Sequence, residues 1–184
     1  MRSLEGGLLA WSPGTDGRPL DAGVTYVPEL FTATEWEAFL ETVEGKWFML
    51  SFPQPTCRPN EQWIQSGIRE SVVQMDEARR TANQRWNQSV AVAREAEGGT
   101  TELHNALEEA GAVGIITSSW PGGAGVARIF DAENRASPTV HLSCEDYGLV
   151  YRLAMNGQDP LLRVTAEAEN LGEVPVYNLS LIHI

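Results

Sequence analysis

Hydrophobic and polar positions change their period in the middle of the segment 101–117. Over residues 101–110 apolar side chains recur every three or four positions, as on one face of a helix, and glutamates occupy the opposite face. Gly111 ends this pattern, because glycine can take up the left-handed conformation that closes a helix. The apolar run over residues 112–116 is typical of a buried strand. The segment therefore predicts a helix that packs on the strand after it, as in layered α/β folds.

The same order of helix, glycine and apolar run occurs earlier in the chain. Thr34 and Glu37 have the three-residue spacing of a capping box, which predicts that a helix begins after Thr34. Gly45 is expected to end that helix, and residues 46–51 form an apolar run that predicts another buried strand. The two segments are too different in sequence to be called a repeat, but they predict two units of the same kind.

A long amphipathic helix is predicted between these two units. Over residues 64–93, apolar or small side chains recur every three or four positions, with charged and amide side chains between them. Gly67 lies near the start, where it can break the helix, and two glycines at residues 98–99 are expected to end it. We interpret residues 61–97 as a helical insertion, whose apolar face either packs on its own sheet or docks another domain.

The remaining segments predict short strands and one more helix. Residues 1–23 are rich in glycine and proline, so we expect a loop or lead-in segment there. The spacing of Ser143 and Asp146 predicts that a helix begins after Ser143. Short strands are expected at residues 24–27, as an edge strand, and at residues 126–130, 136–142 and 162–168. Together the elements predict a mixed α/β fold in one domain, with a small mixed β-sheet, flanking helices and the long helical insertion.

Composition and charge narrow the classes of partner. The chain has 184 residues, of which 42% are hydrophobic, and this favours a globular domain with its own core. It carries 25 acidic and 13 basic residues, a formal charge of -12, which repels phosphate backbones and anionic lipid surfaces. No apolar run is long enough to cross a bilayer, and the first residues do not resemble a secretory signal. We therefore expect neither a nucleic acid nor a membrane as a partner.

Two cysteines, Cys57 and Cys144, are too few for a disulfide framework and too far apart for a short metal knuckle. Two arrangements stay open. They form one disulfide bridge, or they are two unrelated buried thiols, which is the commoner case.

Three segments resemble motifs of the protease-associated domain. Residues 43–50 are similar to its Val-x-Gly-Lys-apolar-apolar-Leu motif, and residues 105–116 resemble its Ala-Gly-Ala-x-Gly-apolar-apolar core. Residues 137–143 are similar to its Ile-Pro-x-Val-x-Ile-Ser strand. The order and spacing of the three motifs extend the resemblance over residues 24–178, and the middle motif is the most specific.

The flanking segments suggest a host for this domain. Residues 10–15 and 174–178 look like the segments that bracket it in two-zinc exopeptidases of the aminopeptidase and glutamate-carboxypeptidase kind. In that metallopeptidase family the domain is noncatalytic and borders the substrate cleft of a secreted or periplasmic hydrolase, whose peptidase domain holds two zinc ions. The resemblance implies that the partners are this peptidase domain and a peptide or protein substrate. A stand-alone interaction or receptor module of the same fold is the alternative.

The sequence departs from that family in two places. The family lacks the helical insertion at residues 61–97, and it would continue after Asn178 into the first strand of the catalytic core. Residues 179–184 do not resemble the family and look like translated vector sequence, so we expect the chain to be a truncated fragment.

Candidate catalytic and metal-binding residues do not form a set. An exopeptidase of this type needs histidine and carboxylate ligands for zinc and a glutamate as general base. None of His104, His141 and His183 is followed two positions later by a carboxylate, so the His-x-Asp pair of the family is missing. The sequence also lacks a Gly-x-Ser-x-Gly motif. We therefore expect no catalytic residue, metal ligand or cofactor in this chain, and no activity from the chain alone.

The segment after residue 117 contains the remaining candidates for contact with a substrate or partner. Trp120 is an aromatic residue that could contact a peptide, although a partly buried tryptophan at a strand end is the commoner case. Gly122 and Gly123 belong to a glycine-rich loop that could surround an anion. This loop does not open a helix and the chain is acidic, so a surface loop is the simpler interpretation.

Overall fold

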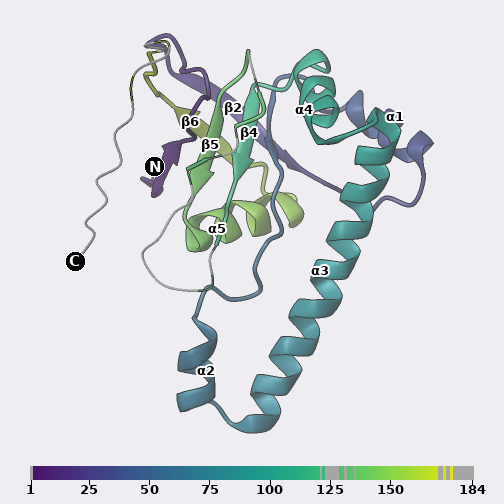
Figure 1. Ribbon diagram of the computed structural model, residues 1–184, viewed down its shortest axis with the longest axis vertical. Coiled ribbons are helices and arrows are strands. Elements are labelled where there is room, and N and C mark those ends of the chain that lie inside the picture. The colour runs from purple at the N-terminus through teal and green to yellow at the C-terminus, as the bar shows by residue number, and fades with distance from the viewer. Residues whose placement is uncertain are drawn as a thin grey trace, which may run out of the picture.

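The computed structural model describes residues 2–120, 122, 129–130, 132–134, 136–169, 172 and 175. These residues form one six-stranded sheet in the order β1-β5-β4-β3-β2-β6 (Figure 1). Strands β2 to β5 are parallel, and the two outer strands, β1 and β6, are antiparallel to their neighbours. The strands are β1 (Gly6–Leu8), β2 (Leu20–Tyr26), β3 (Lys46–Met49), β4 (Gly114–Thr117), β5 (Thr139–Leu142) and β6 (Leu161–Val164).

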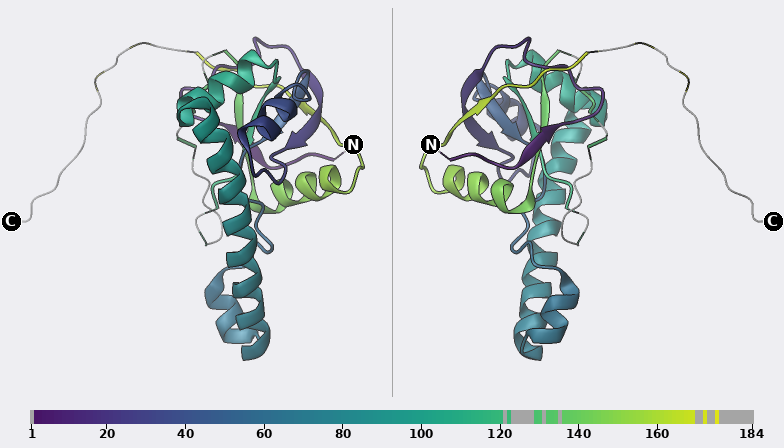
Figure 2. Two further views of the ribbon diagram at one scale, coloured as in Figure 1. Left: turned by 90° about the vertical axis from the view of Figure 1, so that its right-hand side faces the viewer. Right: turned by 90° about the vertical axis from the view of Figure 1, so that its left-hand side faces the viewer.

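Helices cover both faces of the sheet, which confirms the predicted mixed α/β fold. One face carries α1, α4 and the last turns of α3, whereas α5 lies on the other face (Figure 2). The helices are α1 (Ala33–Leu40), α2 (Asn60–Ser66), α3 (Arg69–Glu97), α4 (Thr100–Glu109) and α5 (Cys144–Met155). In the part of the chain that the structure describes, none of them has the length and hydrophobicity that a bilayer crossing requires.

The two faces of the sheet bury two separate hydrophobic clusters. Side chains alternate along a strand, so neighbouring residues point to opposite faces. Phe48 and Ile115 pack with α1, α3 and α4, whereas Trp47 and Ile116 pack with α5. The apolar runs predicted to be buried strands are therefore buried on both sides, which is typical of parallel strands between helices.

Two glycines explain how α4 joins β4. Gly111 has a φ of 80° and closes α4 in the left-handed conformation, as predicted. Gly114 has a different role: a Cβ on this residue would lie 2.5 Å from a ring carbon of Trp47. A side chain at Gly114 would therefore displace the buried tryptophan of the neighbouring strand.

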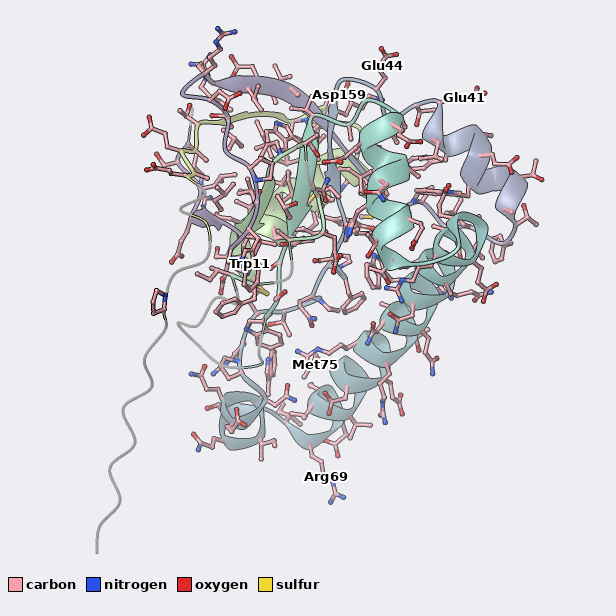
Figure 3. The ribbon with its side chains drawn as sticks, turned by 45° about the horizontal axis from the view of Figure 1, so that its top comes forward. Trp11, Glu41, Glu44, Arg69, Met75 and Asp159 are labelled. Carbon is pink, nitrogen blue, oxygen red and sulfur yellow. A yellow bond between two sulfur atoms is a disulfide. The ribbon has the colours of Figure 1, made fainter. Side chains whose placement is uncertain are left out.

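The predicted long helix is confirmed, and the helical segment is divided between α2 and α3, with the break at Gly67. Only the C-terminal part of α3 is buried, through Ser89, Val90 and Ala93. Figure 3 shows Arg69 at the end of this helix that lies farthest from the sheet. The apolar face of α3 therefore packs on the sheet near residue 90. The first turns of α3 extend away from the sheet and lie beside α2 (Figure 1).

Glu108 was predicted to lie on the solvent-exposed face of the helix that is now α4. In the structure its carboxylate instead accepts hydrogen bonds from a segment far along the chain. Its Oε1 accepts hydrogen bonds from Ser137 N at 2.7 Å, Ser137 Oγ at 2.8 Å, Ala136 N at 3.0 Å and Asn134 Nδ2 at 3.1 Å. Partial burial opposes ionisation, but these hydrogen bonds outweigh it and lower the pKa of Glu108. The carboxylate thus fixes the segment that leads into β5.

The N-terminal segment differs from its prediction. Residues 1–23 are not a loop throughout, because β1 and the start of β2 lie within them. Pairing of β1 with β5 compensates for the poor strand propensity of its two glycines. Strand β2 is not an edge strand, because it lies between β3 and β6.

One local prediction is corrected, and two others concern residues that the structure largely or wholly leaves undescribed. The capping box of α1 is formed by Thr32 and Glu35 in place of Thr34 and Glu37. The strand predicted at residues 126–130 and the tail at residues 179–184 lie largely or wholly outside the described residues.

Candidate binding cleft

A cleft of about 680 Å³ opens where the parallel strands end. In a parallel sheet the loops after all strands meet at the same edge, which is where α/β folds commonly bind ligands. The loop after β3, the residues after β4 and the first turn of α5 line this cleft. A second hollow of about 440 Å³ shares Gln54, Ser118, Ser119 and Trp120 with it. The two hollows therefore border the same loops and adjoin each other.

Tyr147 of α5 holds two of the loops that border the cleft. Its hydroxyl donates to the Ser51 carbonyl at 2.8 Å and accepts from the Ser51 N–H at 2.9 Å. The Ser51 hydroxyl in turn accepts from the N–H of Ser118 at 2.9 Å. Burial raises the pKa of Tyr147, so the hydroxyl remains protonated and able to donate. One side chain thus holds the loops that follow β3 and β4 against α5.

A disulfide bridge joins Cys57 to Cys144 in the wall of the cleft. The two residues are 87 positions apart in sequence, but their Cα atoms lie 5.8 Å apart. The strand order explains this proximity, because the loop after β3 and the residues after β5 reach the same edge of the sheet. The structure thus contains the bridge and not the two unrelated thiols that are the commoner case. It ties the proline-rich loop to the start of α5.

Aromatic and arginine side chains form the wall on the side of the helical insertion. Trp120 lines the cleft, half-buried, and the guanidinium carbon of Arg79 lies 5.4 Å from its ring centroid. Arg79 also donates to Asn60 Oδ1 at 2.8 Å. In the second hollow, the rings of Phe52 and Trp86 meet edge to face at 6.3 Å. The structure thus places one predicted contact residue, Trp120, in the cleft.

Only one of the other two predicted contact residues can be placed relative to this wall. Gly122 is described but does not line either hollow, and Gly123 lies outside the described residues.

His141 lines the cleft, a position that its sequence pattern did not predict. It lies in β5, is 5% exposed and lines the cleft, and its Nε2 has no hydrogen-bond partner among the described residues. Burial lowers the pKa of His141, and the nearby charge of Glu5 only partly opposes this, so the ring is neutral at pH 7. Its place at the end of a predicted strand was the one signal in the sequence that could have identified it.

Charged groups of both signs surround the cleft. Arg58 and Arg152 line it together with Glu5 and Glu145, and none of these four side chains forms an ion pair within the described part of the chain. The cleft therefore does not select strongly for ligands of one charge.

Zinc does not fit the residues described. Within the ranges that the structure covers, no three histidine, cysteine, aspartate or glutamate side chains are placed to hold one metal ion. His104 is buried in α4 and His141 lies in β5, and both cysteines are in the disulfide. We therefore derive no chemistry through a metal in this chain.

Comparisons with known proteins found no match in sequence and a weak similarity in fold. The sequence matches no protein-family model and no curated protein. Among solved structures, the fold is similar to a peptidase M28 precursor from Shewanella amazonensis SB2B, with 18% sequence identity and a TM-score of 0.47. The match covers 91% of this chain and 32% of that protein, so the chain spans about a third of its length. A likeness this weak says nothing about activity.

Proposed function

We propose that this chain is a noncatalytic, protease-associated module of a zinc-dependent exopeptidase. In this role it packs on the peptidase domain, borders the substrate cleft and controls which polypeptides reach the zinc site. The observation that carries the proposal is the position of the three motif-like segments, which lie on three adjacent parallel strands and lead into the walls of one cleft.

Each segment contributes a strand and the loop that follows it. Residues 43–50 contain β3, residues 105–116 contain the second half of α4 and most of β4, and residues 137–143 contain β5. These strands are neighbours in the sheet, in the order β5-β4-β3. Segments that are far apart in the sequence thus lie side by side in the sheet. This supports the interpretation that the three motif resemblances belong to one domain.

The chemistry of the cleft suits a polypeptide better than a reaction centre. Its walls combine the Trp120 ring, guanidinium groups and neutral polar side chains, which is the mixture that contacts peptide side chains and main chain. The two zinc ions and the general base of such an enzyme would belong to the peptidase domain of the parent chain.

A peptidase assay tests the noncatalytic role. The purified chain is incubated with zinc and unblocked peptides, with a zinc carboxypeptidase as a positive control, and products are followed by mass spectrometry. We expect no hydrolysis by this chain. Zinc-dependent turnover that persists through metal-free purification controls would overturn the proposal.

The coding DNA beyond the codon for Asn178 tests the proposed host. A reading frame that continues into a strand ending in His-x-Asp supports the exopeptidase. A natural stop codon at that point would instead favour a stand-alone interaction module of the same fold.

A further inference from the structure

Two side chains that line the cleft, Gln54 and His141, each carry a buried polar atom without a hydrogen-bond partner among the described residues, and so does Thr117, which does not line the cleft. These atoms are Gln54 Oε1, Thr117 Oγ1 and His141 Nε2. Thr117 and His141 are directly paired in the register of β4 and β5, and Gln54 and His141 line the same cleft. Buried polar atoms usually have a hydrogen-bond partner, because leaving one unpaired costs about 1–3 kcal/mol. The two atoms on side chains that line the cleft therefore indicate a ligand that makes hydrogen bonds.

The chemistry of these atoms limits the class of ligand. Gln54 Oε1 can only accept a hydrogen bond, so the ligand must offer a donor. The neutral imidazole of His141 can donate, so the ligand can also present an acceptor. A carboxylate or phosphate supplies acceptors alone and leaves Gln54 unpaired. A peptide group supplies one N–H and one C=O.

The surroundings of the site also favour a neutral polar ligand. Two arginines and two glutamates surround the cleft, and the chain as a whole carries a charge of -12. A strongly anionic ligand would meet Glu5 and Glu145 as well as Arg58 and Arg152. The main chain of a peptide is neutral, so the mixture of positive and negative side chains around the cleft does not repel it.

We propose that the cleft binds the main chain of an extended peptide, with Gln54 Oε1 accepting from a peptide N–H and His141 Nε2 donating to a peptide C=O. Trp120 and the aromatic pair in the adjoining hollow contact the apolar side chains of the same peptide. This inference deepens the proposed function, because it names the part of a polypeptide substrate that this cleft contacts.

The test uses the isotope-labelled full chain and two blocked peptides. One is acetyl-Ala-Ala-Phe-Ala-Ala-amide, which is uncharged, and the other has the same sequence with N-methyl groups on its central amides. Methylation removes the N–H donors but keeps the side chains. We expect the first peptide to shift the NMR signals of Gln54, Ser118, Trp120 and His141, and the methylated peptide to bind about three- to tenfold more weakly.

A pair of variants separates main-chain recognition from general packing. Gln54→Met removes the acceptor in a loop where no regular structure depends on it, and it should weaken binding of the unmethylated peptide about three- to tenfold. Gln74→Met makes the same change on an exposed position of α3 and should leave binding unchanged. No signal shift at millimolar peptide, shifts away from the cleft, or equal binding of both peptides would each overturn the inference.

This inference and the proposed function can fail separately. Turnover of an unblocked peptide would overturn the noncatalytic role even if the peptide binds in the cleft. Absence of binding would overturn the inference even if no turnover is seen.

Discussion

The hydroxyl of Tyr147 allows a direct test of how the loops beside the cleft are held in place. It makes two hydrogen bonds to the main chain of Ser51, at 2.8 and 2.9 Å, and the Ser51 side chain continues the network to Ser118. Tyr147→Phe keeps the buried ring and removes only the oxygen. The two main-chain groups of Ser51 then lose their partner inside the protein.

The expected cost follows from these two bonds. A hydrogen bond of this kind contributes about 1 kcal/mol net, so the variant should lose about 2 kcal/mol of unfolding free energy. For a chain of this size that corresponds to a fall in melting temperature of about 4–8 °C. Urea denaturation followed by circular dichroism measures the free energy, and a thermal scan measures the temperature.

Tyr151→Phe is the matched control for this experiment. Tyr151 lies one turn later on the same helix and packs against Tyr26, but its hydroxyl has no hydrogen-bond partner among the described residues. Its removal should cost less than about 0.5 kcal/mol. The reasoning is refuted if the two variants lose the same stability, or if Tyr147→Phe is as stable as the wild type.

Two further predictions concern the wall of the cleft and the segment before β5. Replacing Cys57 and Cys144 by serine opens a loop that spans 87 positions. Chain entropy sets a limit of about 4.6 kcal/mol for such a loop, and we expect a loss of about 2–4 kcal/mol in urea denaturation; a loss below about 1 kcal/mol would contradict the role of the bridge. The lowered pKa of Glu108 means that its contribution to stability is present above the ordinary pKa of 4.5 and is lost as the pH falls through the lower folded value. Glu108→Gln should therefore flatten the fall of unfolding free energy between about pH 5 and pH 3, whereas Glu109→Gln, on the exposed side of α4, should leave that fall as in the wild type. Identical pH profiles for the wild type and Glu108→Gln would contradict this account.

Elements whose side chains show their own period were predictable from the sequence. The long helix, α4 and the buried strands β3 and β4 carry apolar residues at helical or strand spacing, and this spacing reflects local geometry alone. The glycine that ends α4 was predictable for the same reason. By contrast, β1 was missed because its pairing with β5 depends on residues more than 130 positions away.

Most of the cleft depends on the order of strands, which local patterns do not contain. The bridge between Cys57 and Cys144 and the proximity of Gln54 to His141 both follow from the meeting of loops at one sheet edge. The hydrogen bonds of Glu108 likewise depend on a segment far along the chain. Trp120 could be chosen as a candidate because it directly follows a predicted strand, and the structure brings it to the cleft.

The central claim is that the cleft binds a polypeptide and that the chain does not cleave it. The most direct test is the proton NMR spectrum of an unblocked Ala-Ala-Phe-Ala-Ala peptide with the full chain and zinc. We predict that the peptide signals broaden on addition of the chain, that Trp120→Ala reduces this broadening, and that no product signals appear during prolonged incubation. Peptide signals as sharp as in buffer would contradict binding, and product signals that depend on the chain would contradict the noncatalytic role.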